Sequence, residues 1–322
     1  MPVASPVVIL GGSGFIGTRL ASRLSELGQS FIIGDIVESK THPDSYTSCD
    51  VREAATIQNL LVGARAIVNL AAEHRDDVRP LSRYHETNVE GARQVCQAAT
   101  AAEIKTLVFT SSVAVYGSHT YPVDESGPFE PCNPYGETKL QAEGIYRAWA
   151  EEDSARSLVI IRPTVVFGEG NRGNVYNLLR QIVAGRFMMV GPGTNRKSMA
   201  YVGNVADALI FGLGLGPGTH IFNYADAPDM DMNELVGLVN SKLKRTSSFN
   251  WRIPMPLALA GGYLLDIVAR LTRRTFPIST VRVKKFCENT QFISTKIDTY
   301  GFMRRYSLLE GLSAMMSHEF DF

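Results

Sequence analysis

The sequence has few of the features that mark membrane-spanning, secreted and metal-binding proteins. No run approaches the roughly 18 to 20 uninterrupted apolar residues of a spanning helix. The N-terminus passes from Met1 into a strand-like run at 7–10, without a basic segment or a cleavage site, which argues against secretion. The four cysteines are scattered and form no CxxC pair, which argues against a disulfide framework or a zinc site. We therefore expect a cytoplasmic globular protein without a bound metal.

The charge is balanced in number but unevenly placed. The chain has 32 Lys and Arg against 32 Asp and Glu, yet the segment 241–285 holds ten lysines and arginines and a single acid, Asp266. At its centre, 254–271 is helical in pattern and mostly apolar, but too short and interrupted to cross a bilayer. Cations beside an apolar helix favour an anionic membrane surface. Packing of this helix on the rest of the protein is the alternative. Without aromatics interleaved among its cations, the segment does not favour nucleic acid.

The first half of the chain alternates short β-branched runs with longer helical patterns. This alternation predicts an α/β fold with a doubly wound parallel sheet. After residue 165 glycine, proline and asparagine become frequent, and the helices at 175–184 and 205–213 are separated by loops. We expect a dinucleotide-binding domain at 1–165 and a smaller mixed lobe at 166–322 that contacts the substrate. The predicted strands are 7–10, 31–34, 66–70, 107–110 and 158–162, and the predicted helices are 15–27, 54–61, 83–101 and 135–150.

A glycine-rich turn follows the first predicted strand and opens the first helix. Glycines at this spacing let a pyrophosphate approach main-chain N–H groups at a helix N-terminus. Asp35 ends the second predicted strand, where a carboxylate hydrogen-bonds the adenine ribose. Asp35 would repel a 2′-phosphate and no arginine follows it, so NAD is favoured over NADP. The predicted contacts are Gly11, Gly14, Phe15, Ile16, Gly17 and Asp35.

Tyr135 and Lys139 lie four residues apart on one face of a predicted helix. A cation near a phenol favours the phenolate, which is a base that works near neutral pH. Ser112 ends the strand-like run before this helix, where its hydroxyl can hydrogen-bond a substrate oxygen. The three residues are the predicted catalytic set.

Together the motifs resemble the extended short-chain dehydrogenase/reductases that act on nucleotide sugars. The resemblance rests on the glycine turn, Asp35, CDV at 49–51, NLAA at 69–72, NVEG at 88–91, TSSVAVYG at 110–117 and YGETK at 135–139. It implies a homodimer built through a pair of helices and a catalytic role for Ser112, Tyr135 and Lys139. It also implies further cofactor contacts at Asp50, Val51, Leu70, Ala71, Ala72, Tyr135, Lys139 and Asn88, with Asn88 touching the nicotinamide half.

Two departures from the family pattern narrow the range of reactions that the resemblance allows. Dehydratases of the family place an Asp-Glu pair directly after the serine or threonine, whereas this chain has Val113 and Ala114, which cannot transfer protons. Dehydration is therefore not expected. In nucleotide-sugar enzymes an RxxN motif supplies an asparagine to the sugar nucleotide, and here Val165 stands in its place.

Longer strings resemble the bacterial 4-epimerases that act on N-acetylglucosamine linked through a diphosphate to a polyprenol. The strings are 71–78, 109–117, 162–182, 197–204 and 281–292. This resemblance implies conversion of lipid-linked GlcNAc to GalNAc through a transient 4-keto sugar and bound NAD, for O-antigen synthesis at the cytoplasmic face of the inner membrane. Two alternatives stay open: a soluble UDP-sugar 4-epimerase and an NAD(P)H-dependent 4-keto-sugar reductase. Arg172, Arg196 and Lys197 are candidates to bind the diphosphate, with solvated loop cations as the alternative.

Overall fold

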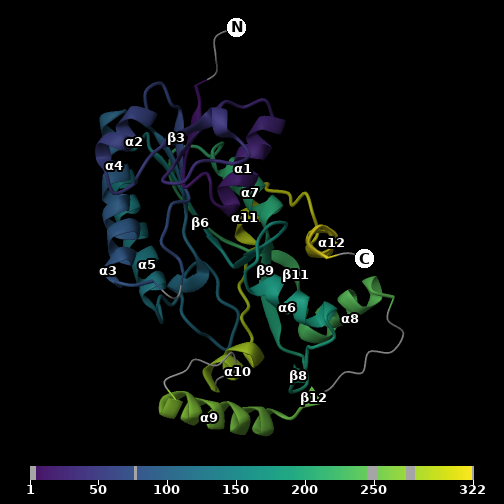
Figure 1. Cartoon of the computed structure of the whole chain (residues 1–322). Helices are drawn as coiled ribbons and strands as arrows, with labels where there is room; N and C mark the ends of the chain where they lie inside the picture. Colours follow the sequence, from purple (N-terminus) through teal and green to yellow (C-terminus); the bar gives the residue numbers. More distant parts are fainter. Residues whose placement is uncertain (1–4, 76–77, 245–251, 273–279, 321–322) are drawn as a thin grey trace.

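The computed structural model describes residues 5–75, 78–244, 252–272 and 280–320, apart from the side chains of 269–271, 282 and 285. A central sheet with helices on both faces forms one part of the molecule. A smaller mixed lobe lies beside it, and the helices α9 and α10 lie at the edge farthest from the N-terminus (Figure 1).

The central sheet has seven strands in the order β3-β2-β1-β4-β5-β6-β10, and every neighbouring pair is parallel. The chain order reverses between β1 and β4, and the crevice beyond the carboxyl ends of strands at such a point is where α/β proteins bind ligands. The strands are β1 (Val7–Leu10), β2 (Phe31–Asp35), β3 (Tyr46–Ser48), β4 (Ala66–Asn69), β5 (Thr106–Thr110), β6 (Ser157–Pro163) and β10 (Gly218–Tyr224).

Helices cover both faces of this sheet because its inner strands are apolar on both sides, as parallel strands between helices must be. Residues of β1 are fully buried in both directions. Helix α1 buries Gly17, Leu20, Ala21 and Leu24, the spacing of one helical face. On one face lie α2 (Ala54–Leu60), α4 (Gly91–Ala101) and α5 (Pro134–Glu151), and on the other α1 (Phe15–Glu26), α7 (Val202–Gly212) and α11 (Lys296–Thr299) (Figure 1).

The smaller lobe is built on a three-stranded sheet in the order β11-β9-β7. Its helices enclose a separate apolar core with Leu179, Leu235 and Leu312 at its centre. The elements are β7 (Val165–Phe167), β9 (Arg196–Tyr201), β11 (Asp226–Asp231), α6 (Asn174–Val183), α8 (Met232–Lys242) and α12 (Leu308–Glu319). Two-residue strands β8 (Met189–Val190) and β12 (Arg252–Ile253) pair beside it, and α9 (Met255–Thr272) and α10 (Thr280–Cys287) follow.

The predicted α/β class and doubly wound sheet are confirmed, with all five predicted strands in place. The sequence did not predict β3 or β10. Because β10 pairs with β6, the central sheet takes a strand from beyond residue 165. The single helix predicted at 83–101 is α3 (Ser82–His85), a π-helical turn at Glu86–Glu90 and α4. Such turns inside helices are frequent at functional sites, and this one carries Asn88.

Candidate active site

The turn between β1 and α1 has the backbone that a dinucleotide pyrophosphate requires. Gly11 has φ +76° and a Cβ there would come within 2.6 Å of the Ala71 nitrogen, so the two loops meet only because residue 11 is glycine. A Cβ on Gly17 would lie 2.5 Å from the Cα of Gly12. Gly14 precedes the first turn of α1, where Phe15 and Ile16 present main-chain N–H groups free of any side-chain cap.

Asp35 lies at the carboxyl end of β2 and holds the glycine turn from one side. Its carboxylate accepts hydrogen bonds from the main-chain N–H of Ser13 at 3.0 Å and of Val37 at 3.1 Å. The buried hydroxyl oxygen of Ser13 has no hydrogen-bond partner among the described residues. An unpartnered buried hydroxyl in a glycine turn, with a carboxylate at the ribose position, fits NAD: the turn would hold its pyrophosphate and Asp35 its adenine ribose.

The other predicted cofactor contacts line the same carboxyl edge. The Ala71 nitrogen donates to Asn69 Oδ1 at 3.0 Å, which fixes the loop of Leu70, Ala71 and Ala72 against the glycine turn. Asp50 is bound to Arg52 by a contact of 2.5 Å, and this hydrogen bond lowers the pKa of Asp50. Its neighbour Val51 is buried.

Asn88 is buried, and its side-chain amide is bound to protein on both sides. Its Oδ1 accepts from the Glu73 nitrogen at 2.8 Å, while Nδ2 donates to the Glu73 carbonyl at 3.0 Å and to Thr138 Oγ1 at 2.9 Å. Asn88 therefore fixes the loop after β4 to the catalytic helix α5. A direct contact with nicotinamide stays a prediction.

The structure brings Ser112, Tyr135 and Lys139 together. The N-terminus of α5 is set by Asn133, whose Oδ1 accepts from the Gly136 nitrogen at 2.8 Å. A Cβ on Gly136 would lie 2.4 Å from the Ala114 carbonyl oxygen, so glycine here lets Tyr135 approach the turn that holds Ser112. Lys139, one turn further along α5, is buried and donates from Nζ to the Thr110 carbonyl at 2.6 Å.

Burial controls the pKa values of this catalytic set. It raises the pKa of Tyr135 above its ordinary value, and hydrogen bonding to Ser112 offsets only part of the rise. It lowers the pKa of Lys139 to about 7, against the opposing field of Glu143. The sequence predicted a lowered phenol pKa. The direction differs because removal of the phenol from water outweighs the stabilisation of its charged form.

The sequence analysis missed a buried ion pair directly behind the catalytic set. Glu143, one turn beyond Lys139, accepts from Arg162 Nε at 2.8 Å and Nη2 at 2.6 Å, and both side chains are fully buried. Ser111 donates to the same carboxylate at 2.6 Å, and Arg147 reaches it at 2.9 Å. Burial raises the pKa of Glu143, but the pair with Arg162 outweighs it and holds the pKa below the ordinary value. The one signal in the sequence is the four-residue spacing from Lys139.

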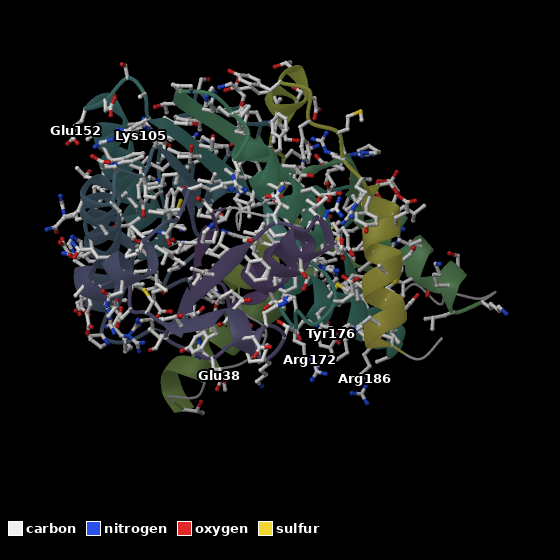
Figure 2. All side chains as sticks on the ribbon, turned by 90° about the horizontal axis from the view of Figure 1, so that it is seen from above. Glu38, Lys105, Glu152, Arg172, Tyr176 and Arg186 are labelled. Carbon is white, nitrogen blue, oxygen red and sulfur yellow. The ribbon has the colours of Figure 1, made fainter. Side chains whose placement is uncertain are left out.

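The three candidate diphosphate cations lie in two places. Arg172 is 76% exposed, lies over the ring of Tyr176 and is 3.9 Å from Glu319 at the outer edge of the small lobe (Figure 2). Arg196 and Lys197 begin β9. Arg196 donates to the Asp229 carbonyl at 2.5 Å, and Lys197 donates to the Glu288 carbonyl at 3.1 Å. Within the described part of the chain, no cluster of three or more His, Cys, Asp or Glu side chains could hold a metal ion.

The geometry around Asp35 makes a prediction about cofactor choice. Replacing Asp35 with Ala removes a charged acceptor for the ribose, so we expect NAD to bind about 10- to 100-fold more weakly. Discrimination against NADP should also relax, because the repulsion of its 2′-phosphate disappears. Fluorescence titration with both dinucleotides measures this. Asp35→Asn is the matched control, since it removes the charge but keeps one acceptor oxygen for either Ser13 or Val37. A wild-type protein that binds NADP more tightly than NAD would contradict the assignment.

The fold and this site together define an extended short-chain dehydrogenase/reductase, whose glycine turn and Asp35 would hold a dinucleotide. The model of the NAD dependent epimerase/dehydratase family matches residues 7–225. The chain belongs to that family, and the predicted NAD dependence is confirmed with it.

Comparison with individual proteins gives the same family. The chain is 45% identical over 318 residues to the N-acetyl-alpha-D-glucosaminyl-diphospho-ditrans,octacis-undecaprenol 4-epimerase of Escherichia coli O157:H7, covering 98% of this chain and 95% of that protein. It resembles the structure of MoeE5 in complex with UDP-glucose and NAD, with a TM-score of 0.76, 22% identity and 98% of each chain covered. It also resembles the UDP-N-acetylglucosamine 4-epimerase of Methanobrevibacter ruminantium M1, with a TM-score of 0.75, 21% identity and coverage of 98% and 97%.

Proposed function

We propose that the protein is an NAD-dependent 4-epimerase that converts GlcNAc to GalNAc while the sugar is linked through a diphosphate to undecaprenol, for bacterial surface polysaccharide synthesis. The observation that carries this proposal is the 45% identity, over 98% of the chain, to an enzyme named for that activity. The catalytic set of Ser112, Tyr135 and Lys139 supports the chemistry, because epimerisation at C4 needs a base for the 4-hydroxyl.

Each catalytic residue has a task set by its place. Tyr135, as phenolate, takes the proton of the 4-hydroxyl and returns a proton when the 4-keto sugar is reduced on its other face. Ser112 hydrogen-bonds the C4 oxygen from the turn after β5. Lys139 supplies the positive charge that helps Tyr135 lose its proton, and Glu143 opposes the effect of burial, which lowers the pKa of Lys139. Bound NAD supplies the hydride acceptor and donor, and because it ends as it began, the reaction is redox-neutral.

The turn after Ser112 supports epimerisation over dehydration. Val113 and Ala114 occupy a short 3₁₀ turn directly beside the catalytic serine. Neither side chain can move a proton, so elimination of water has no acid or base at this place. Val165, at the start of β7, likewise offers no polar contact to a nucleotide sugar.

The diphosphate contacts are part of the proposal. Arg196 and Lys197 lie side by side on β9, and burial lowers the pKa of Lys197 against the field of Glu288. A diphosphate near Lys197 would favour its charged form. Arg172, in the loop before α6, is the third candidate.

Parallel assays with two substrates test the function. We expect purified enzyme with NAD to form GalNAc from GlcNAc-diphospho-polyprenol, with little turnover of UDP-GlcNAc and no net change in NADH absorbance. Turnover of UDP-GlcNAc alone would contradict the proposal in favour of a soluble UDP-sugar epimerase. Stoichiometric consumption of NAD(P)H would contradict it in favour of a 4-keto-sugar reductase.

We also propose a homodimer that buries the α4 and α5 faces. An open groove of about 840 Å³ runs along α4 and α5 and is lined partly by small residues, among them Ala101, Gly144 and Ala148. Small residues let helices approach closely. Glu152, at the end of this groove, lies on the side of the molecule away from Arg172, so the groove is distant from that candidate contact (Figure 2). Light scattering of the purified protein distinguishes a dimer from a monomer.

A substrate held in a bilayer places the enzyme at the membrane surface, and we propose a peripheral location on the cytoplasmic face of the inner membrane. Among the described helices, none is long and apolar enough to cross a membrane. The proposed contact is therefore interfacial. It falls within the basic and apolar segment 241–285, of which 245–251 and 273–279, with Arg245, Arg273 and Arg274, lie outside the described residues.

A further inference from the structure

Helices α9 and α10 form a pair at the edge of the molecule farthest from the N-terminus (Figure 1). Helix α10 contacts the small-lobe core through Phe286, whose ring lies against Phe187. Helix α9 has 18 residues, of which only Asp266 and Arg270 are charged. An apolar helix in this position needs an apolar surface to cover it.

Five large apolar side chains of α9 are exposed. Leu257, Tyr263 and Leu264 are 63–65% exposed, and Ile267 and Val268 are 38% and 40% exposed. At about 100° per residue these five side chains fall on one face of the helix. We call this set the outer face of α9. Large apolar side chains gathered on one exposed face mark an interaction site rather than ordinary surface.

The opposite face of α9, which we call its inner face, is turned toward α10. Gly262 is buried there, and the carboxylate of Asp266 accepts a hydrogen bond from the Thr280 nitrogen at 3.1 Å, at the start of α10. The only acid of the segment 241–285 is thus turned toward α10. No described acidic side chain of α9 lies on the outer face, which removes the main electrostatic obstacle to an anionic surface.

Lys284, which lies on α10, is exposed and adds a positive charge to the helix pair. Lys242 and Lys244 are also exposed, but they lie at the C-terminal end of α8 in the small lobe. Arg252 is also exposed but donates to the Pro192 carbonyl at 2.7 Å and to Asn233 at 2.9 Å, which holds the start of α9 to the small lobe. An apolar face without acidic side chains, with a cation on the neighbouring helix, fits a helix lying in the headgroup region of an anionic bilayer.

From these observations we propose that the outer face of α9 docks the enzyme on an anionic lipid bilayer, with the helix axis parallel to the membrane plane. The inference rests on the proposed function, because a polyprenyl substrate gives the enzyme a reason to sit there. Docking would also bring the candidate diphosphate-binding residues Arg196 and Lys197 near the lipid. Asn195, just before β9, donates to the Phe286 carbonyl of α10 at 2.8 Å. Lys197 of β9 donates to the carbonyl of Glu288, which follows α10, at 3.1 Å, so the end of α10 is joined directly to the start of β9.

Vesicle flotation of the full-length protein tests the docking face. We expect wild-type protein to float with vesicles of equal parts phosphatidylglycerol and phosphatidylcholine, less at high salt, and less with phosphatidylcholine alone. Leu257→Glu and Leu264→Glu should each weaken partitioning by about tenfold or more, because each removes an exposed leucine that the bilayer would bury and adds a negative charge. Met303→Glu is the matched control: Met303 is 85% exposed, lies outside the pair and should leave flotation unchanged.

Two further measurements separate this inference from the function itself. The outer-face variants should keep wild-type NAD binding and thermal stability, and wild-type turnover of a short-chain water-soluble substrate, while losing turnover of the full-length substrate in vesicles. Vesicle binding that depends on the outer face without any epimerisation would support the docking and remove the proposed function. Epimerisation of vesicle-held substrate by a wild type that does not float, or by variants that float unchanged, would overturn the docking alone. If Leu264→Glu changes the oligomeric mass and the wild type does not bind vesicles, the outer face is a protein interface, and the proposed membrane docking is overturned.

Discussion

Tyr135→Phe is expected to lose epimerase activity by ~10²–10⁴-fold or more, since the phenolate is the base for the sugar hydroxyl. The change removes one oxygen from a half-buried ring at the N-terminus of α5 and leaves the glycine turn and Asp35 untouched. NAD binding should therefore stay within a few-fold of wild type. The measurement is the rate of GalNAc formation beside a NAD titration of the same preparation.

The matched control for this variant is Tyr300→Phe. Tyr300 is partly exposed and packs edge-on against Phe222 of β10, away from the catalytic set. Loss of its hydroxyl should leave turnover unchanged. Activity of Tyr135→Phe within tenfold of the wild type would remove Tyr135 from the mechanism.

Glu143→Gln is expected to have the largest effect on stability and a second large effect on turnover. Removing one partner of a buried ion pair leaves the other charge, Arg162, uncompensated, and such changes cost about 3–5 kcal/mol of unfolding free energy. Loss of the carboxylate also removes the field that opposes the lowered pKa of Lys139, so fewer molecules carry the Lys139 cation at neutral pH. Without the Lys139 cation, ionisation of the Tyr135 phenol is less favourable. Denaturant unfolding and a pH–rate profile measure the two effects.

The pH dependence of stability has a definite sign here. The folded-state pKa of Glu143 is lowered, so its contribution is complete above the ordinary glutamate value of about 4.3 and is lost as the pH falls through the lowered value. Glu143→Gln should lack this acid-side loss. The control on the same helix is Glu151→Gln, an exposed carboxylate at the end of α5, which should change neither stability nor turnover.

A double replacement separates charge from packing. Glu143→Met with Arg162→Met removes both charges, so its cost should be less than the sum of the two single replacements. Additive costs would mean that the two side chains do not act as a pair.

The parts of the fold and the site that rest on local pattern could be predicted from the sequence. The glycine turn, Asp35, Tyr135 and Lys139 each follow from spacing within one element, and the structure places them at one edge of the sheet. The spacing of Leu20, Ala21 and Leu24 likewise predicts the buried face of α1. Patterns of this kind depend only on the periods of helices and strands.

What could not be predicted depends on distant residues. Glu143 and Arg162 are charged residues, and a sequence gives no reason to bury either until β6 is placed beside α5. The π-helical turn at Glu86–Glu90 carries Asn88, whose side chain bonds to Glu73 and Thr138 in other parts of the chain, and these contacts are not visible in the local pattern. For α9, apolar spacing alone fits both a packed and an exposed helix, and only its place at the edge of the molecule distinguishes them (Figure 1).

The most direct test of the account is conversion of GlcNAc-diphospho-polyprenol that carries deuterium at C4, followed by mass analysis of the released sugars. The account predicts GalNAc in equilibrium with GlcNAc, with the deuterium retained at C4 in both and no net NADH formed. Retention follows because the hydrogen removed from C4 is the one returned to it. No GalNAc from this substrate, or GalNAc whose C4 hydrogen comes from solvent, would contradict the account.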